Sequence, residues 1–164
     1  MMCDLSERMI GYRLESSMVV PVSLWDVFAF FEDPRNLTRI TPEWLRFRIT
    51  SPGRIQMRKG AEFEYQIRWL GLPLKWKSAI TEYEPPFFFA DEQTSGPYAY
   101  WRHRHDFKPT ESGALVSDRV DYALPFGPLG RLAHRLVVRR QLERIFAYRQ
   151  KALAGMLTGA TAAK

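Results

Sequence analysis

The chain has 164 residues, a length that fits one domain and can bury a substantial core without cross-links. Hydrophobic residues make up 46% and aromatic residues 14% of it, which excludes a disordered chain, and no run approaches the roughly 18 consecutive apolar residues of a membrane span. Lys and Arg number 24 against 18 Asp and Glu, for a formal charge of +6. The excess lies in one segment, because the residues from Pro128 onward include eight basic side chains and a single acidic one, Glu143.

The single cysteine and the N-terminal composition predict neither a disulfide nor a signal peptide. Cys3 is the only cysteine, so it forms no internal disulfide and no thiolate metal cluster, and we interpret it as an ordinary thiol. Residues 1–17 contain acids and lack a continuous apolar core. We therefore expect a cytoplasmic protein with a single domain over 1–157 and a frayed tail over 158–164.

The first elements predicted are a strand and two short helices. Residues 10–20 alternate between apolar and polar side chains, which indicates a strand that a proline ends. Ser23 is a suitable N-cap for a short helix over 24–31, which an Asp-Pro pair terminates. A second short helical segment is predicted over 35–39, since the next Thr-Pro pair disfavours helix.

The middle of the chain, from Trp44 to Leu124, has the period of two that is typical of strands buried on one face. Its clearest stretch is 61–69, where Ala, Phe, Tyr, Ile and Trp alternate with polar residues. The other strands are expected near 45–49, 74–80, 87–93, 98–107 and 115–124. Short turns rich in glycine and proline separate them, so neighbouring strands should pair antiparallel.

After the Pro-Phe-Gly-Pro segment at 125–128 the period becomes helical, which predicts one long amphipathic helix over about 129–156. The predicted fold class is therefore α+β, with a curved antiparallel sheet of about seven strands wrapped around a long C-terminal helix and two short helices after the first strand. One helix covers only part of such a sheet, so we expect a cavity between them.

The stretch 89–107 is rich in aromatic residues and contains FADEQ at 89–93, GPY at 96–98 and WRHRHDF at 101–107. Together with the order of elements, this run resembles the START-like helix-grip superfamily (SRPBCC), which includes polyketide cyclases and dehydrases, lipid-transfer domains and ubiquinone-binding proteins. The resemblance covers about 12–157. It implies a deep pocket that holds an apolar small molecule or acyl chain, but no particular reaction, because this fold serves binding proteins and enzymes alike.

Five polar side chains interrupt the apolar stripes of the last three strands, namely Asp91, Gln93, His103, His105 and Asp118. Burying such a group unpaired costs about 1–3 kcal/mol, so these side chains should bond one another, water or a ligand. Turn composition leaves the strand registers open. Either His105 or His103 lies opposite Asp118, and one register of the preceding hairpin sets Asp91 beside His103.

Several interpretations of this cluster stay open: a satisfied polar network, the polar end of a ligand pocket, an acid/base pair or a metal site. The candidate catalytic residues are His103, His105 and Asp118, which could move the protons of a cyclisation or dehydration. A metal would need Asp91 or Asp118 as a third ligand beside the two histidines, and no tight metal motif exists. We predict no metal and no other cofactor.

The predicted pocket combines aromatic walls with this polar end. The candidate ligand-binding residues are Phe63, Tyr65, Ile67, Trp69, Trp76, Phe89, Asp91, Gln93, Trp101, His103, His105, Tyr122, Leu136 and Phe146, with Leu74 beside them. For any one aromatic residue, ordinary core packing is the simpler interpretation, but together they favour an enclosed volume. The expected function is binding of a hydrophobic small molecule or lipid-like metabolite, and the alternative is a cyclase/dehydrase-like enzyme.

The basic helix adds a second alternative. Its cationic residues, Arg135, Arg139, Arg140, Arg144, Arg149 and Lys151, are expected on the solvated side of the helix. They could hold the protein weakly and peripherally at an anionic membrane, as an accessory protein. No nucleic-acid partner is expected, because the sequence has no recognised nucleic-acid fold signature. The oligomeric state and the identity of the ligand stay open.

Overall fold

The computed structural model of the protein describes residues 11–53 and 55–161, with side chains described up to Leu157. Seven strands form one antiparallel sheet in the order β1-β7-β6-β5-β4-β3-β2. The strands are β1 (Tyr12–Val20), β2 (Arg48–Ile49), β3 (Glu62–Trp69), β4 (Leu72–Glu84), β5 (Phe88–Ser95), β6 (Tyr100–Thr110) and β7 (Gly113–Ala123). The predictions for Cys3, Ile10 and residues 162–164 lie outside the described residues.

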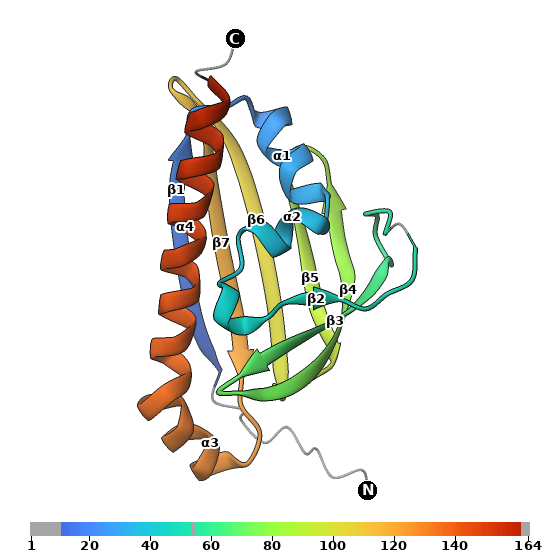
Figure 1. Cartoon of the computed structure of the whole chain (residues 1–164), viewed down its shortest axis with the longest axis vertical. Coiled ribbons are helices and arrows are strands. Elements are labelled where there is room, and N and C mark those ends of the chain that lie inside the picture. Colours follow the sequence, from blue (N-terminus) through green and yellow to red (C-terminus); the bar gives the residue numbers. More distant parts are fainter. Residues whose placement is uncertain (1–10, 54, 162–164) are drawn as a thin grey trace, which may run out of the picture.

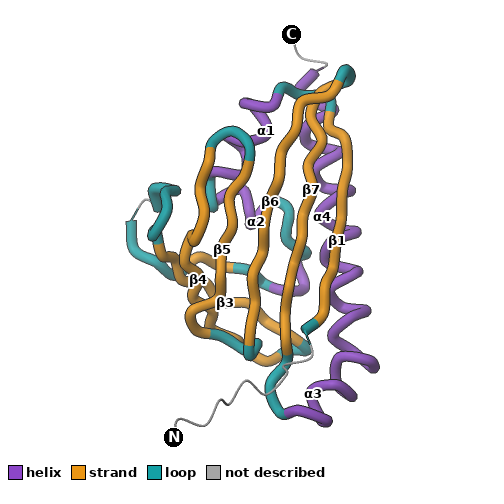
Figure 2. Tube along the Cα trace, turned by 180° about the vertical axis from the view of Figure 1, so that it is seen from behind, coloured by secondary structure: helices purple, strands orange, loops and turns teal. Residues whose placement is uncertain are grey.

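All helices lie on one side of the sheet (Figure 1), and the view from behind shows the strands uncovered (Figure 2). The helices are α1 (Leu24–Glu32), α2 (Arg35–Arg39), the 3-10 turn η1 (Glu43–Leu45), α3 (Gly127–Ala133), the π-helical turn η2 (His134–Val138) and α4 (Arg139–Thr161). The last three follow one another without a break, because their junction residues keep right-handed helical backbone angles. The curved sheet and the long C-terminal helix confirm the predicted fold class.

Several elements differ from their predicted extents; the strand expected near 74–80, for example, covers the whole of β4. The strand expected over 45–49 shrinks to β2, because η1 occupies its beginning and Arg46 then adopts left-handed backbone angles with φ 44°. The helix expected over 129–156 begins earlier, contains η2 and continues to Thr161. The predicted N-cap is confirmed: the Ser23 hydroxyl accepts a hydrogen bond from the backbone N–H of Asp26 at 3.1 Å.

The registers left open by the sequence are settled by the β6–β7 and β5–β6 hairpins. His105 lies opposite Asp118, and Asp91 lies opposite His103. Gly113 begins β7 with φ +141°, and a Cβ there would come within 2.0 Å of the Val20 carbonyl oxygen. A glycine at this position therefore lets the hairpin approach β1 closely.

The hydrophobic core consists of two clusters that meet at the predicted polar residues. Along β6, Trp101 belongs to one cluster and Phe107 to the other, with the two histidines between them. Along β7, Val120 and Val116 belong to the same two clusters, with Asp118 between them. The strict alternation of a strand thus directs apolar and polar groups to the same inner face.

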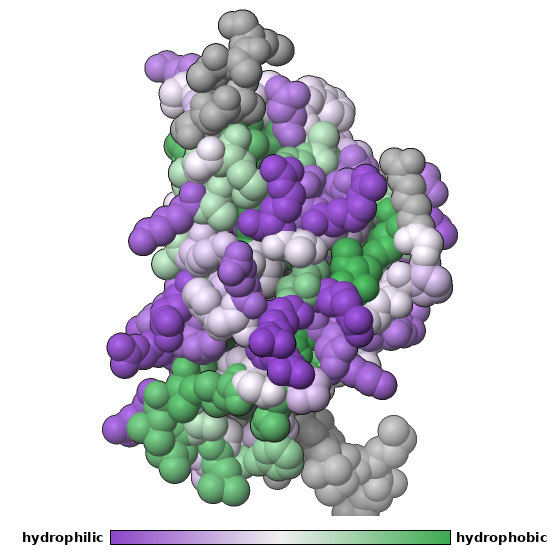
Figure 3. Space-filling view, in the orientation of Figure 1, coloured by the Kyte–Doolittle hydropathy of each residue, from purple (hydrophilic) through white to green (hydrophobic). Residues whose placement is uncertain are grey.

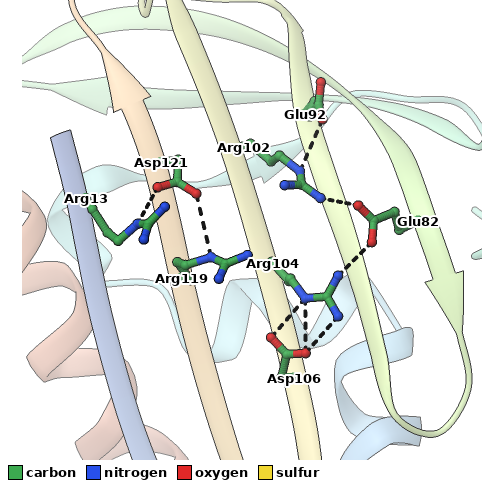
Figure 4. A network of polar contacts seen from close by, with 8 residues as sticks. All are labelled: Arg13, Glu82, Glu92, Arg102, Arg104, Asp106, Arg119 and Asp121. Carbon is green, nitrogen blue, oxygen red and sulfur yellow. Dashed lines mark hydrogen bonds and ion pairs between the residues drawn. The ribbon is translucent and has the colours of Figure 1, made fainter. Parts of the chain in front are cut away.

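The opposite, outer face of the sheet carries a network of charged side chains (Figure 4). It consists of Arg13, Glu82, Glu92, Arg102, Arg104, Asp106, Arg119 and Asp121. Arg104 connects two strands, since it pairs with Glu82 of β4 at 2.6 Å and with Asp106 on its own strand at 2.9 Å. This face is polar and partly solvated, so the cavity lies on the inner face. None of the described helices is long and apolar enough to cross a membrane.

Candidate ligand-binding site

A cavity of about 420 Å³ lies between the inner face of the sheet and the C-terminal helical segment. This volume falls within the range of small-molecule sites. Of the residues proposed from the sequence, those that line it are Tyr65, Ile67, Trp69, Leu74, Trp76, Trp101, His103 and Phe146. The structure therefore contains the hollow interior that a wide sheet under one helix predicts.

Aromatic rings from three strands form a continuous wall of this cavity. The rings of Tyr65 on β3 and Trp76 on β4 are stacked, with centroids 5.6 Å apart and an interplanar angle of 17°. Trp76 in turn meets Trp101 of β6 edge-on, at 5.2 Å. Because each ring is held by its neighbours, contacts within the protein fix the shape of this wall.

A second cavity of about 120 Å³ lies beside the first. Four further residues proposed from the sequence line it, namely Phe63, Phe89, Asp91 and His105. The two cavities share a wall that consists of Leu37, Tyr65, Trp101, His103 and Arg149. The single pocket predicted from the sequence is therefore divided, and the polar residues lie at and behind the division.

The polar cluster is centred on Asp118, which is only 7% exposed. Its Oδ1 atom lies 3.0 Å from Nε2 of His103 and 2.7 Å from Nδ1 of His105. Burial alone would raise the pKa of Asp118, but the contacts with the two histidines outweigh it and hold this pKa well below its ordinary value. Asp118 is therefore a buried carboxylate that its histidine neighbours keep ionised.

His103 is the neutral partner of that carboxylate near pH 7. Burial is the main cause that lowers its pKa to about 3, His105 adds to the effect, and the hydrogen bond to Asp118 only partly opposes it. A neutral ring whose Nε2 faces a carboxylate carries its proton there. The proton of His103 is thus committed to a structural hydrogen bond.

Three residues proposed for the pocket line neither cavity, namely Gln93, Tyr122 and Leu136. The Gln93 side chain instead closes the loop between β5 and β6: its Nε2 donates to the Tyr98 carbonyl at 2.8 Å, and its Oε1 accepts from the Tyr98 N–H at 3.3 Å. A Cβ on Gly96 would lie 2.4 Å from that same Oε1 atom. The Tyr122 ring is buried in the core, and its hydroxyl is 2.9 Å from Nε2 of His134.

The proposed lining residue Leu136 is misplaced as well, because its side chain is 66% exposed. It lies in η2, and a π-helical turn holds more residues than an α-helical one, which changes the direction of the side chains that follow. Leu132 before this turn and Leu136 within it point to solvent, whereas Val138 and Leu142 point to the cavity. A uniform helical period across this segment does not predict the change.

Arg149 was also assigned to the wrong environment from the sequence. We expected it on the solvated face, but it is only 8% exposed and lines both cavities. It follows Phe146 by three positions and precedes Leu153 by four, a spacing that places all three on one helical face. That spacing is the signal that could have located it.

Asp91, His103 and His105 are the described residues whose spacing suits a metal ion, since one ligand atom from each lies within 4.8 Å of the others. Burial raises the pKa of Asp91, against the opposing effects of His105, Ser78 and Arg149. The charge of Arg149 acts on this group and repels a cation. The absence of a metal therefore stays a prediction.

Comparison with known proteins identifies the family and the fold. A family model described as polyketide cyclase / dehydrase and lipid transport matches residues 20–146. The chain is similar to the solved structure of TTHA0849 from Thermus thermophilus, with a TM-score of 0.73, 15% identity and coverage of 91% of this chain and 99% of that one. It is also similar to the Zhui aromatase/cyclase from a Streptomyces species, with a TM-score of 0.72, 13% identity and coverage of 90% and 94%.

A third similar structure is major latex-like protein 151 from Panax ginseng, with a TM-score of 0.63, 11% identity and coverage of 90% of this chain and 98% of that one. At such identities the likeness shows a shared fold. The chain has no match among curated proteins.

Proposed function

Because the chain belongs to the polyketide cyclase/dehydrase and lipid transport family, within the START-like superfamily, we propose that it binds a hydrophobic small molecule or lipid-like metabolite. The observation that carries this proposal is the cavity of about 420 Å³ with its wall of aromatic rings. A ligand that buries about 200–300 Å² of apolar surface there gains roughly 5–7 kcal/mol before the costs of ordering. Before those costs this gain corresponds to a Kd of about 10–200 μM.

The ligand enters beside α3. Phe126 and Leu129 contribute to the cavity wall and are nevertheless 81% and 71% exposed, so they stand at its opening. Pro97 and Tyr98 of the β5–β6 loop line the same cavity. Two loops at one end of the sheet therefore frame the opening, and the aromatic wall continues inward from them.

The polar cluster favours sequestration over proton transfer. A general base works best when its pKa is near the operating pH, and the pKa of His103 is lowered to about 3. Asp118 lines neither cavity, so it presents no carboxylate to a substrate there. A cyclase or dehydrase mechanism built on this pair would begin from a weak base.

A substitution that fills the opening tests the proposal. Ala133 lines the cavity, yet its side chain is exposed, so Ala133→Trp adds an indole at the opening without disturbing the core. We expect the neutral fluorescent probe N-phenyl-1-naphthylamine to bind the wild-type protein with a Kd of roughly tens of micromolar, and Ala133→Trp to weaken this binding at least about tenfold. Fluorescence titration measures both values.

The matched control is Ala147→Trp. Ala147 is also exposed on the C-terminal helix, but it lines neither cavity, so its indole should leave the Kd unchanged. If the wild-type protein did not bind the probe, or if both tryptophan variants weakened binding equally, the cavity would not be the binding site.

A second candidate function is exchange of the ligand at an anionic membrane, and exposed apolar side chains favour it. Figure 3 shows hydrophobic residues gathered at the end of the molecule where α3 lies. Among them, Leu129, Leu132 and Leu136 are each more than half exposed. Exposed arginines, Arg131, Arg135, Arg139 and Arg140, lie on the same helical segment. Apolar groups beside cations are suited to the surface of an anionic bilayer.

Vesicle binding tests this second function. We expect the protein to sediment with phosphatidylglycerol vesicles at low salt and to be released at high salt, because the arginines act through a screened attraction. The variant Leu132→Ser/Leu136→Ser should weaken sedimentation at least about tenfold, since it removes apolar area from the surface. Both leucines lie outside the cavity, so probe binding should not change. Equal sedimentation of the two proteins would exclude this surface.

A further inference from the structure

Arg149 on α4 is a buried cation whose hydrogen-bonding capacity is not met by the protein. Its side chain is nine-tenths buried, and neither Nε nor Nη1 has a hydrogen-bond partner among the residues that the structure describes. Its guanidinium carbon lies 4.9 Å from the centroid of the Phe146 ring, which supports the flat group from one side. A buried charge without a partner is costly, so an anion that reaches it is bound strongly.

The position of Arg149 makes it reachable from the cavity. It belongs to the wall that the two cavities share, together with Tyr65, Trp101 and His103. The acids that face this region are Asp91 on β5 and Asp118 on β7, and neither forms an ion pair with Arg149 within 4 Å. Asp118 is engaged by the histidines instead. The guanidinium is therefore free to accept an anion from a ligand.

The charge around the site selects the type of anion. Within the described part of the chain, Arg149 is the one Lys or Arg that lines either cavity. The guanidinium of Arg149 carries one positive charge and therefore neutralises one negative charge of a ligand. A phosphate monoester carries more than one charge near pH 7, and its excess charge would be repelled by the nearby carboxylates. A carboxylate carries one charge, and its two oxygens match the two parallel N–H groups of a guanidinium.

We propose that the ligand is an apolar carboxylate, with its carboxylate bound by Arg149 at the shared wall and its apolar body in the larger cavity. This inference rests on the proposed function, since it names the chemical class of the same ligand. The polar strand residues were expected to bind the polar end of the ligand, and in this proposal Arg149 binds it instead. The carboxylate of the ligand binds the cation of α4, and the acidic cluster of β5 and β7 lies behind the division.

The test compares two probes that have the same shape and differ in charge, 2-naphthylacetate and 2-naphthylacetamide. Calorimetric titration should show that the wild-type protein binds the acetate roughly 10- to 100-fold more tightly than the amide. Arg149→Gln should remove this preference and leave the affinity for the amide within about threefold. Arg149→Lys should keep a smaller preference, because an ammonium retains the charge but not the planar fork.

The control variant is Arg140→Gln, which removes an exposed arginine from the same helix and should keep the full preference. Equal binding of both probes by the wild-type protein would overturn the assignment of a carboxylate, and so would a preference that survives in Arg149→Gln. Failure of the wild-type protein to bind either probe would also overturn it, provided that N-phenyl-1-naphthylamine binds. If that neutral probe did not bind either, the proposed function itself would fail. Should Arg149→Gln not fold, the wild-type comparison and Arg149→Lys still decide the question.

Discussion

Asp118→Ala is expected to lower the free energy of unfolding by about 3–5 kcal/mol, the cost of removing one partner of a buried charged contact. The Asp118 carboxylate is almost fully buried and accepts contacts from His103 and His105. Without it, both imidazole nitrogens face a methyl group in the interior, where no water replaces the lost oxygen. Urea denaturation, monitored by tryptophan fluorescence, measures the loss in the free energy of unfolding.

Asp121→Ala is the matched control, since it removes the same carboxylate from the same strand. Asp121 lies on the outer face of β7, where its Oδ1 atom is 2.6 Å from Nε of Arg13 (Figure 4). The Arg13 side chain is 57% exposed, so this pair is screened by solvent and its loss should cost less than about 1 kcal/mol. Equal losses in the two variants would mean that the inner cluster contributes no more than a surface ion pair.

The predicted stability role of Asp118 explains why the polar cluster supports a binding site. His103 forms part of the wall between the two cavities, and its ring is held through the hydrogen bond to Asp118. Nδ1 of His105 lies 2.7 Å from the same oxygen, and its ring packs against Phe89, at 4.4 Å between ring centroids. The carboxylate therefore fixes two rings that shape the cavities, which is a positioning function.

The inner face of the central strands was predictable because the period of a strand is strict. Alternation alone directed His103, His105 and Asp118 inward, and the structure places all three there. Alternation does not determine which residues lie opposite each other, since a shift of two positions keeps every side chain on its face. The contact between His105 and Asp118 thus needed the structure.

The helical segment was less predictable because its period changes. The π-helical turn η2 separates two stretches whose side chains differ in direction, so Leu136 was assigned to the cavity although it faces solvent. Arg149 was assigned to solvent because of its charge, although its spacing from Phe146 and Leu153 indicates the buried face. Gln93 was predicted to line the pocket for a different reason, its place on the strand. Its side chain instead forms hydrogen bonds with the backbone of Tyr98 in the loop after β5.

Arg149→Met is expected to raise the free energy of unfolding of the ligand-free protein by about 2–4 kcal/mol. Burial removes the guanidinium from water, and the protein returns no hydrogen bond to Nε or Nη1. Methionine has a similar unbranched stem, fills the same space beside Phe146 and carries no charge to desolvate. A gain in stability on removing an arginine would be the signature of a site whose charge is kept for a ligand.

Ligand addition separates this explanation from simple repacking. At a concentration of 2-naphthylacetate about 100 times its Kd, the wild-type protein should gain about 2.7 kcal/mol, whereas Arg149→Met should gain much less at the same concentration. Arg140→Met, which changes an exposed arginine of the same helix, should alter neither the stability nor the response to ligand by more than about 0.5 kcal/mol. A less stable Arg149→Met protein would show instead that the guanidinium stabilises the fold by itself, through Phe146 or the nearby carboxylates, without need of an anionic ligand.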